Sequence, residues 1–526
     1  MAVAARYRLA AFVFGGIAAC EPAPSPGTNP SPPDPPGWGD PVLLEVRASF
    51  DRAPVRVDPV SLDYGSITQE PLVGVAWQVL LDGELADEGV TDGAGTLRFS
   101  APARAPVELL LLAEAPAAGL TVVDNTRDFA IYAHIEPLVM PEEPGELDVR
   151  VGLDHDGVRY TDRSAAPFAI LSTLRRVSEA VLDAAGGALD PLTVHWSVDN
   201  IPSPGNRTAG RIGTSFYASN TGIWLLGAED VDTDELDEAV LAHEWFHFYE
   251  DTRSRADTRG GTHGPDVVLH PAVAFSEGSV TALGCASLGI DHYTDTLGSG
   301  QVGGFTWALD THRAGEAVGF FGSRSVASVV WDLVDEGPED DDGLAYGLGG
   351  LLSVWEDELV LTPSVSSIYA LGAAVRARSP GDAAALDALF AKEDIAPAVD
   401  PWGTGETNDG GVVGAVDGAL VPEILLDEEV VLVGLGPRAP GHQLQEYRFR
   451  RFTAPFAGAF SARIDAGEPD VDLRVFLRGA RLCAGLSPDG EERCEFSAEA
   501  GDTVLIEVDG GQHNEAVDVP LWVEAR

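Results

Sequence analysis

The chain has few basic residues for its size: 33 lysines and arginines stand against 84 aspartates and glutamates, a formal net charge of −51. A protein that binds the phosphates of nucleic acids needs a basic surface, so this balance excludes a nucleic-acid partner. A strongly acidic surface favours solubility and exposure outside the cytoplasm. A length of 526 residues exceeds what one hydrophobic core usually holds and predicts about three folded units.

Cysteine is also scarce, at four residues. No two of them have the spacing of metal ligands, which excludes a zinc site built from cysteines. Cys483 and Cys494 stand on either side of a turn sequence at residues 487–490, and we expect a disulfide across this hairpin in an oxidising compartment. Cys285 lies within a helical pattern and is expected to be a small buried residue.

After the N-terminus the chain lacks any run of about 18 apolar residues, so no membrane-spanning helix is expected. Residues 1–19 contain Arg6 and Arg8 followed by a short apolar stretch, which is the order of a signal peptide. An isoleucine and two alanines then precede Cys20, a sequence that resembles the bacterial lipobox. The resemblance implies cleavage before Cys20 and a lipid anchor on its sulfur, and Glu21 favours the outer membrane, at its periplasmic face or the cell surface.

Changes in composition divide the rest of the chain. Residues 20–40 are rich in proline and predict an extended tether behind the lipidated cysteine. Residues 41–155 carry short strand-like runs separated by Asp-Gly turns, typical of a small β-sandwich, and resemble the immunoglobulin-like accessory modules of secreted bacterial proteins. Residues 403–420 are rich in glycine and aspartate and predict a linker. In residues 421–526 short strands return, and their Asp-Val-Asp-Leu and Gly-Asp pieces resemble the pre-peptidase C-terminal domain, which implies an accessory β-sandwich.

Between these parts, residues 156–402 mix helical and strand patterns. Apolar residues recur there at helical spacing. We expect helices near residues 165–184, 234–252, 272–288 and 324–335. Mixed helices and strands flanked by two β units predict an α+β multi-domain fold. The middle region is the candidate catalytic domain.

One segment of the middle region carries the pattern H-E-x-x-H, formed by His243, Glu244 and His247. Asp232 with Glu235 three residues later predicts a capping box at the start of a helix. On that helix both histidines continue an apolar stripe, so two imidazoles replace apolar side chains on a buried face. Burying unpaired imidazoles is costly, whereas two histidines one turn apart can bind the same zinc ion. The motif therefore predicts a zinc site, with Glu244 able to reach a zinc-bound water.

A third ligand is expected from a second helix. The metzincin pattern needs a glycine and a histidine at the positions held by Glu250 and Arg253, so that class is excluded. Glu277 lies thirty residues after His247 in a helical stretch that begins at Pro271, on the stripe expected to face inward. An inward carboxylate needs a cation, which makes Glu277 the candidate. The rival ligands in and after the connecting loop are His263, Asp266 and His270.

H-E-x-x-H followed by Glu-Gly on a second helix resembles the gluzincins, the thermolysin-like and aminopeptidase-like zinc peptidases. The resemblance implies a zincin-like domain with one catalytic Zn²⁺, in which Glu244 is the general base. The metal ligands that it implies are His243, His247 and Glu277. It also implies that residues 221–227 form the edge strand that holds an extended substrate.

Some features depart from this pattern or stay open. Thr281 stands where thermolysin-like enzymes carry a carboxylate that orients a ligand histidine. The group that stabilises the transition state is not assigned, and its candidates are His263, Tyr293 and Tyr346. Calcium is considered at the acidic turns 154–157 and 339–343, but neither completes an EF-hand loop, so surface turns are the preferred interpretation.

Together these patterns predict an exported, membrane-anchored zinc peptidase that hydrolyses peptide bonds in proteins or peptides. A binding or adhesion lipoprotein that keeps the zincin-like shape without turnover is the alternative from another class, and the lack of a carboxylate at Thr281 favours it. A structural zinc site is a third interpretation, because such sites use four protein ligands, and His263 would then be the fourth.

Overall fold

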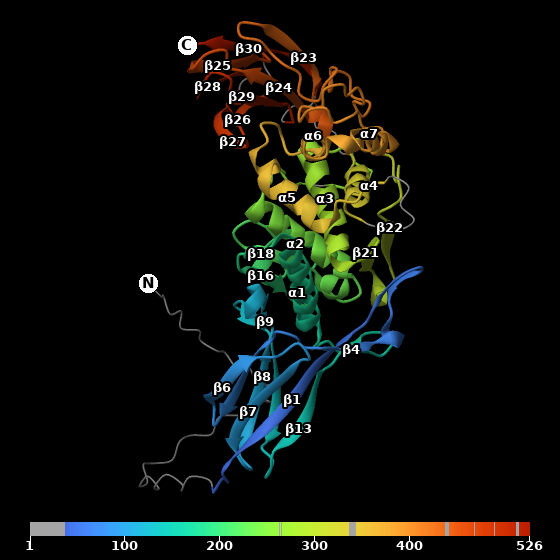
Figure 1. Ribbon diagram of the computed structural model, residues 1–526, viewed down its shortest axis with the longest axis vertical. Helices are drawn as coiled ribbons and strands as arrows, with labels where there is room; N and C mark the ends of the chain where they lie inside the picture. The colour runs from blue at the N-terminus through green and yellow to red at the C-terminus, as the bar shows by residue number, and fades with distance from the viewer. Residues whose placement is uncertain are drawn as a thin grey trace, which may run out of the picture.

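The computed structural model describes residues 37–526, except for residues 262, 265, 336–342, 437–440, 468, 489 and 512–514. Three units follow one another along the long axis of the molecule: a β unit, a helical unit with its own sheets, and a second β unit (Figure 1). The predicted signal peptide, the lipidation site Cys20 and most of the tether lie outside the described residues. In the described part, no helix combines the length and the apolar character needed to cross a membrane.

The first unit consists mainly of two four-stranded sheets. One comprises β1 (Pro41–Arg52), β4 (Thr68–Pro71), β7 (Thr96–Pro102) and β13 (Gly145–Val151), and the other β5 (Ala76–Leu81), β6 (Glu84–Val90), β8 (Pro106–Leu112) and β12 (Ala133–Val139). The rings of Trp77 and Phe99 meet between the two sheets, 6.4 Å apart. The predicted turn at Asp82 and Gly83 joins β5 to β6, and both residues have the positive φ that this tight hairpin requires.

Two small hairpins form separate two-stranded sheets. They are β2 (Val55–Val57) with β3 (Val60–Leu62), and β14 (Asp154–His155) with β15 (Tyr160–Asp162). In the second hairpin Asp156 accepts hydrogen bonds from the backbone N–H groups of Val158 and Arg159, so this acidic turn closes on itself. Most of the other turn considered for calcium, residues 339–343, lies outside the described residues.

The middle unit is built on a six-stranded sheet in the order β11-β10-β16-β18-β17, with β9 also paired to β10. Its strands are β9 (Glu114–Ala115), β10 (Leu120–Asp124), β11 (Ala130–Ile131), β16 (Leu192–Trp196), β17 (Phe216–Ala218) and β18 (Gly222–Leu225). Strands β10, β16 and β18 run parallel, and β17 lies antiparallel at the edge. The prediction of residues 221–227 as the edge strand is therefore wrong. Strand β17, with only three residues, is too short to show a strand pattern in the sequence, and it covers the outer side of β18.

A second sheet of the middle unit has the order β19-β20-β21-β22. It comprises β19 (Gly227–Ala228), β20 (Asp232–Thr233), β21 (His292–Leu297) and β22 (Gly303–Ala308). One short 3-10 turn (Asp234–Leu236) separates β20 from the H-E-x-x-H helix, and β21 directly follows the helix that carries Glu277. The sheet is therefore joined through the chain to both of these helices.

The described part of the chain contains seven α-helices. They are α1 (Ala166–Ala185), α2 (Glu238–Arg253), α3 (Pro271–Leu288), α4 (Ser323–Val334), α5 (Gly347–Asp357), α6 (Ile368–Arg378) and α7 (Ala383–Lys392). The first four confirm the helices expected from apolar spacing. The predicted capping box is wrong, because α2 begins only at Glu238 and Asp232 belongs to β20. The carboxylate of Glu235 is instead buried and accepts hydrogen bonds from Arg163, at 2.8 Å from its Nε.

Two glycines allow the helices around the motif to pack closely. A Cβ on Gly284 of α3 would lie 3.1 Å from the backbone nitrogen of His243 on α2. A Cβ on Gly278, the glycine of the Glu-Gly pair, would lie 2.5 Å from the carbonyl oxygen of Ser323 at the start of α4. Side chains at these positions would push the helices apart, so both glycines help to bring α2, α3 and α4 together.

The third unit is a sandwich of two four-stranded sheets, ordered β23-β30-β25-β28 and β24-β29-β26-β27. The strands are β23 (Glu429–Leu435), β24 (Tyr447–Thr453), β25 (Gly458–Asp465), β26 (Asp472–Leu477), β27 (Ala480–Gly485), β28 (Glu491–Ala498), β29 (Thr503–Asp509) and β30 (Val517–Ala525). The predicted disulfide between Cys483 and Cys494 is present. The hairpin predicted for it is wrong, because β27 and β28 belong to different sheets. The disulfide therefore joins the two sheets of the sandwich.

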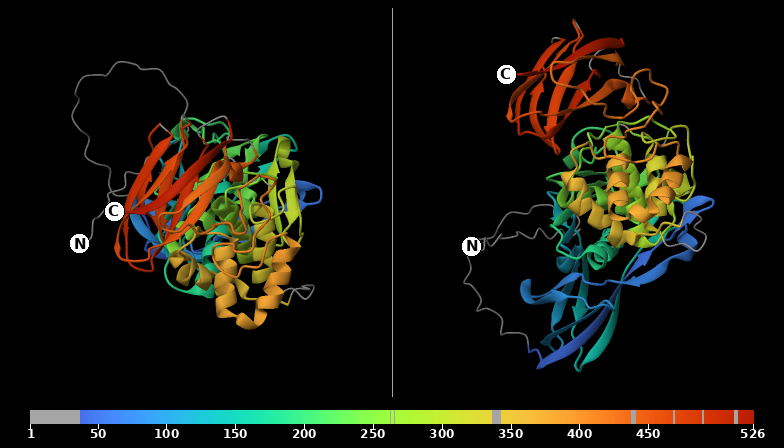
Figure 2. Two further views of the ribbon diagram at one scale, coloured as in Figure 1. Left: turned by 90° about the horizontal axis from the view of Figure 1, so that it is seen from above. Right: turned by 45° about the horizontal axis from the view of Figure 1, so that its top comes forward.

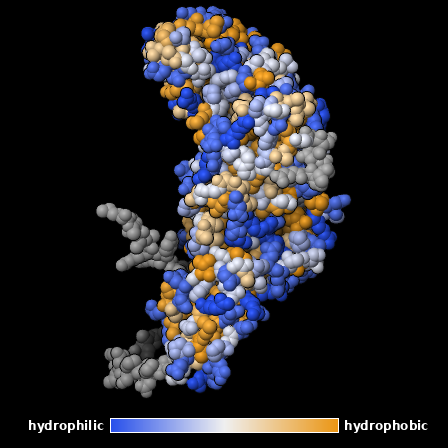
Figure 3. Space-filling view, in the orientation of Figure 1, coloured by the Kyte–Doolittle hydropathy of each residue, from blue (hydrophilic) through white to orange (hydrophobic). Residues whose placement is uncertain are grey.

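Apolar cores distinguish the units. One continuous core runs through the first and middle units and includes Val412 and Leu420, so the predicted linker packs onto the middle unit. The same core extends to Phe449 and Leu505 of the third unit. The third unit has a separate core between its own sheets. Figure 2 shows the third unit standing on the helical layer from two further directions. On the face in Figure 3, polar and apolar residues are mixed over all three units of the bowed molecule.

Candidate metal centre

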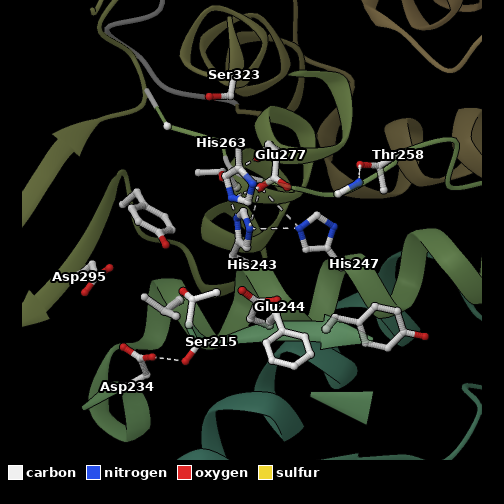
Figure 4. Close-up of a pocket in the computed structure, with 18 of the residues that line it drawn as sticks. Ser215, Asp234, His243, Glu244, His247, Thr258, His263, Glu277, Asp295 and Ser323 are labelled. Carbon is white, nitrogen blue, oxygen red and sulfur yellow. Dashed lines mark hydrogen bonds and ion pairs between the residues drawn. The ribbon is translucent and has the colours of Figure 1, made fainter. Parts of the chain in front are cut away.

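The two motif histidines and Glu277 meet where α2 and α3 face each other. His243 and His247 lie one turn apart on α2, with 3.2 Å between their Nε2 atoms. Glu277 Oε2, from α3, lies 3.3 Å from His243 Nε2 and 3.7 Å from His247 Nε2. One ligand atom from each of the three residues falls within 4.8 Å of the others, and Figure 4 shows the side chains pointing at a common centre. The three residues thus form a group that could hold a metal ion.

The far side of His243 is held by Thr281. The Thr281 hydroxyl donates to the backbone carbonyl of Glu277 at 2.7 Å, and its oxygen lies 2.9 Å from His243 Nδ1. A hydroxyl has one proton to donate, so the threonine oxygen must accept from the Nδ1–H group. The proton on Nδ1 leaves the lone pair of Nε2 directed at the centre, as a metal ligand requires. Thr281 therefore performs the orienting role for which a carboxylate was missing in the sequence.

The far side of His247 is held by a serine and a carboxylate. Ser276 Oγ lies 3.3 Å from His247 Nδ1 and donates to Glu250 Oε2 at 2.5 Å. By the same count of protons, His247 donates from Nδ1, so Nε2 is the ring nitrogen that faces the centre. Glu250 also lies 3.8 Å from His247 Nδ1. Sequence reasoning missed this pair, although a glutamate one turn after His247 on the buried stripe was a signal for it.

The two histidines and the carboxylate of Glu277 attract each other electrostatically. Burial disfavours the charged form of His247, but the negative charge of Glu277 and the hydrogen bond to Glu250 outweigh it and raise the pKa of His247 well above its usual value. Burial alone would raise the pKa of Glu277, but the neighbouring His247 and His243 hold it well below the usual value. The centre therefore favours an anionic carboxylate beside positive charge.

Glu244 stands next to the centre without being part of it. Its side chain is buried, 7 % exposed, and lines the same cleft as the two histidines. Within the described part of the chain its Oε2 atom has no hydrogen-bond partner. A buried carboxylate oxygen left unpaired is unfavourable unless it serves a partner such as a bound water. Its position suits a group that takes up and passes on a proton.

A cleft with a volume of about 720 Å³ opens over this centre. Phe216 and Tyr217 of the edge strand β17 line one part of it, and Tyr293 of β21 lines another. The ring of Tyr293 lies 5.9 Å from the ring of His243. Tyr346, by contrast, is not among the lining residues, and its hydroxyl donates to Asp382. Of the candidates for stabilising a transition state, Tyr293 and His263 lie in the cleft.

His263 reaches the centre from the loop between α2 and α3. Its Nε2 atom lies 3.2 Å from Glu277 Oε2, and its side chain is 44 % exposed. It does not belong to the compact group of three whose ligand atoms all lie within 4.8 Å. The two other rival ligands lie elsewhere: Asp266 accepts a hydrogen bond from the backbone of Glu316, and His270 Nδ1 accepts from the backbone N–H of Ala272.

A second cluster in the same cleft contains only carboxylates. Asp232, Asp234 and Asp295 also bring their oxygens within 4.8 Å of one another. Burial and the neighbouring acid Glu235 raise the pKa of Asp232 to about 6. Burial and the charge of Asp232 raise the pKa of Asp295 to about 7. Sequence reasoning missed this cluster, because it assigned Asp232 to a helix cap and singled out no role for Asp295.

The remaining predicted residue agrees with the sequence pattern: Cys285 is a free and fully buried thiol, and burial raises its pKa.

No family model and no curated protein matches the chain. Solved structures that match include the pre-peptidase C-terminal domain of a collagenase from Bacillus anthracis, at 14% identity over 20% of this chain and 93% of that chain, with a TM-score of 0.17. PliG, a periplasmic inhibitor of g-type lysozyme from Aeromonas hydrophila, matches at 13% identity over 20% of this chain and 97% of that chain, with a TM-score of 0.15. The first is the domain type that residues 421–526 resemble in sequence, but TM-scores this low support no conclusion about fold or function.

Proposed function

We propose that this chain is an exported, membrane-anchored zinc peptidase of the gluzincin type that hydrolyses peptide bonds in proteins or peptides. The observation that carries the proposal is the meeting of His243, His247 and Glu277 in an open cleft beside Glu244, whose Oε2 atom has no hydrogen-bond partner among the described residues. Zinc suits this donor set, because two imidazoles and a carboxylate leave one position free for water.

The arrangement fits a metal for a second reason. Both histidines donate from Nδ1 to oxygen acceptors, so both turn their Nε2 atoms towards the same point. With 3.2 Å between these two nitrogens, a proton or a metal ion has to lie between them, and the negative charge of Glu277 favours such a cation. A bound zinc ion would polarise the scissile carbonyl and lower the pKa of its water.

The protein's own groups then divide the proton transfers and the binding of substrate. Glu244 is the general base: it accepts a proton from the attacking water and delivers it to the leaving amine. His263 and Tyr293 are the cleft residues able to donate a hydrogen bond to the oxyanion. Strand β17, which lies at the edge of its sheet in the described part of the chain and lines the cleft, suits an extended peptide that pairs with it as an added strand.

The remaining parts of the proposal concern location. Cys20 carries the lipid anchor, in the outer membrane, and the proline-rich tether holds the folded units away from the lipid surface. The third unit, residues 421–526, is proposed to be a domain of the pre-peptidase C-terminal type.

The direct test is Glu244→Gln, which keeps the shape of the side chain and removes its basicity. We expect peptide cleavage to fall by at least about 100-fold, the lower end of what a general base contributes. Zinc per chain, measured after dialysis, stays at the parental value because Glu244 is not a ligand. A variant that cleaves unfolded proteins and peptide libraries as fast as the parent would show that the mechanism is wrong.

Two alternatives predict different results. An inactive binding or adhesion protein of the same shape would bind zinc yet cleave no member of a broad peptide library; its main support is weakened, since Thr281 and the Ser276–Glu250 pair orient the ligands. A structural zinc site is favoured by the 3.2 Å approach of His263 to Glu277. Counting nitrogen ligands by X-ray absorption of the zinc-loaded protein separates this case, because a closed site would have three imidazoles and no water.

A further inference from the structure

The loop between α2 and α3, which carries His263, is attached to the third unit by an ion pair. Arg259 contacts the carboxylate of Glu507 on strand β29, and its other terminal nitrogen lies 3.6 Å from Asp509 Oδ2. The Arg259 guanidinium also lies over the ring of Tyr447 on β24, 5.3 Å from its centre. This anchor stands four residues before His263.

A second attachment follows His263 in the chain. The backbone N–H of Val268 donates to the carbonyl of Gly441 at 3.1 Å, and its carbonyl accepts from the N–H of Gln443 at 2.6 Å. The backbone N–H of His270 donates to the side-chain oxygen of Gln443 at 3.1 Å. The ring of His270 packs against Tyr447 and Phe449, with centroids 4.7 and 5.3 Å away. The third unit therefore contacts the loop on both sides of His263.

The face of β29 that receives the loop is unusual for a β-sandwich. Val504, Ile506 and Val508 on the inner face of β29 belong to the core of the third unit. Glu507 lies on the opposite face of the strand, yet it is only 3 % exposed. Burial would raise the pKa of Glu507, but His270, Arg259 and Arg474 hold it below its usual value. A buried carboxylate is costly without such partners, and two of these three belong to the α2–α3 segment.

Between the two attachments, His263 Nδ1 lies 3.0 Å from the carbonyl oxygen of Gly261 in the same loop. Gly260 and Gly261 have positive φ, and a Cβ at either would meet nothing within 4 Å. Asp266 accepts one hydrogen bond from the backbone of Glu316. Glycine-rich backbone of this kind takes many conformations unless its ends are held. The position of His263, 3.2 Å from Glu277, thus depends on the anchors.

We propose that the third unit contributes to the active site. The ion pair between Arg259 and Glu507, here called the clamp, makes Arg259 a positioning residue that holds His263 close to the metal centre. This inference rests on the proposed peptidase function. It also changes the role that the sequence resemblance implies, from an accessory domain to a support for a substrate-facing histidine. The clamp acts on the loop with or without metal, so one of its tests is independent of catalysis.

The first experiment measures hydrogen exchange of the peptide that covers residues 256–268, in the full chain, without metal and with zinc. Arg259→Ala is compared with the parent, with Arg259→Lys, and with Arg463→Ala. Arg463 provides the matched control, because it pairs with Glu491 on the other sheet of the sandwich, away from the loop. We expect Arg259→Ala to speed exchange in this peptide by about tenfold, Arg259→Lys to restore much of the protection, and the control to change nothing.

The second experiment measures kcat and KM separately with a peptide that the parent cleaves. Arg259→Ala is expected to lower kcat by about tenfold with little change in KM, because it displaces a group needed in the transition state. In a His263→Ala background the same change should have almost no further effect on kcat, within about twofold, because both act through one group.

Two outcomes would overturn the clamp: unchanged exchange in Arg259→Ala, or independent losses of kcat in the double variant. A parent protein that cleaves no peptide would instead defeat the proposed function, while the exchange experiment would still decide whether the third unit orders the loop.

Discussion

The cleft contains two groups of three side chains that look alike by distance and differ in chemistry. His243, His247 and Glu277 bring their ligand atoms within 4.8 Å of one another, and so do three aspartates nearby. In the first group each histidine has an oxygen partner behind it that fixes which nitrogen carries the proton. In the second group, Asp232 and Asp295 each keep a buried oxygen without a hydrogen-bond partner among the described residues.

The difference shows that close oxygens do not by themselves make a zinc site. Carboxylates gathered in a buried place respond to their mutual repulsion by taking up protons, and the raised pKa values of Asp232 and Asp295 express this response. In the first group, the anionic carboxylate of Glu277 instead favours a cation beside the two Nε2 atoms, which zinc can supply. We therefore expect zinc at the mixed group and protons, at mildly acidic pH, at the aspartates.

The strongest test of this contrast removes one carboxylate from each group. Glu277→Ala is expected to weaken zinc binding by more than about 100-fold, since even outer partners of metal ligands account for about 10–100-fold. Asp295→Ala, its matched control in the same cleft, should bind zinc as the parent does. Both are measured by competition with a fluorescent chelator. Equal losses in the two variants would mean that the aspartates also hold the metal.

A sharper test concerns the support behind His247. Glu250→Gln and Ser276→Ala leave all three ligands in place. The first removes the negative charge beside His247, and the second removes the oxygen that accepts from its Nδ1. Zinc affinity should fall by about 10–100-fold in each. Asp251→Asn is the control, because the neighbouring Asp251 is exposed and pairs with Tyr217 instead. If Glu250→Gln binds zinc as tightly as Asp251→Asn, the orienting role assigned to Glu250 is wrong.

The smallest effect is expected from the pH dependence of stability. In the folded protein the pKa of Asp295 is raised to about 7 from 3.8, so ionisation of this group destabilises the fold as the pH rises through about 7. Asp295→Asn should therefore melt above the parent at pH 8, by on the order of 2–4 °C, the shift that about 1 kcal/mol causes in a domain of 150–250 residues. The difference should shrink steadily towards pH 4. A constant difference across this range would exclude ionisation as its cause.

Periodic features of the sequence predicted several elements of the structure, but helices α5, α6 and α7 were not predicted. Apolar spacing located helices α1 to α4, and an Asp-Gly pair located the β5–β6 turn, because both depend on neighbours within a few residues. The ends of elements were less predictable. Arg163, seventy-two residues before Glu235, binds its carboxylate and prevents the predicted cap, and no local pattern signals such a partner.

The candidate site divides in the same way. Spacing along two helices singled out His243, Glu244, His247 and Glu277, and the structure brings all four to one cleft. The residues that orient these side chains and the loop that faces them could not be predicted, because both depend on contacts between distant parts of the chain. Glu250 acts through Ser276 of another helix, and Arg259 meets a strand 248 residues further along the chain.

Strand β10 has a consequence for how this protein can be divided. The chain leaves the first unit after β8, pairs β10 in parallel with β16 beneath the helices, and returns to the first unit as β12. Strand β10, which lies in the chain between two strands of the first unit, is thus part of the sheet that supports the metal centre. The N-terminal unit cannot be removed or exchanged as a separate cassette without opening that sheet. We therefore expect it to unfold in one step with the middle unit, with which it also shares one continuous core.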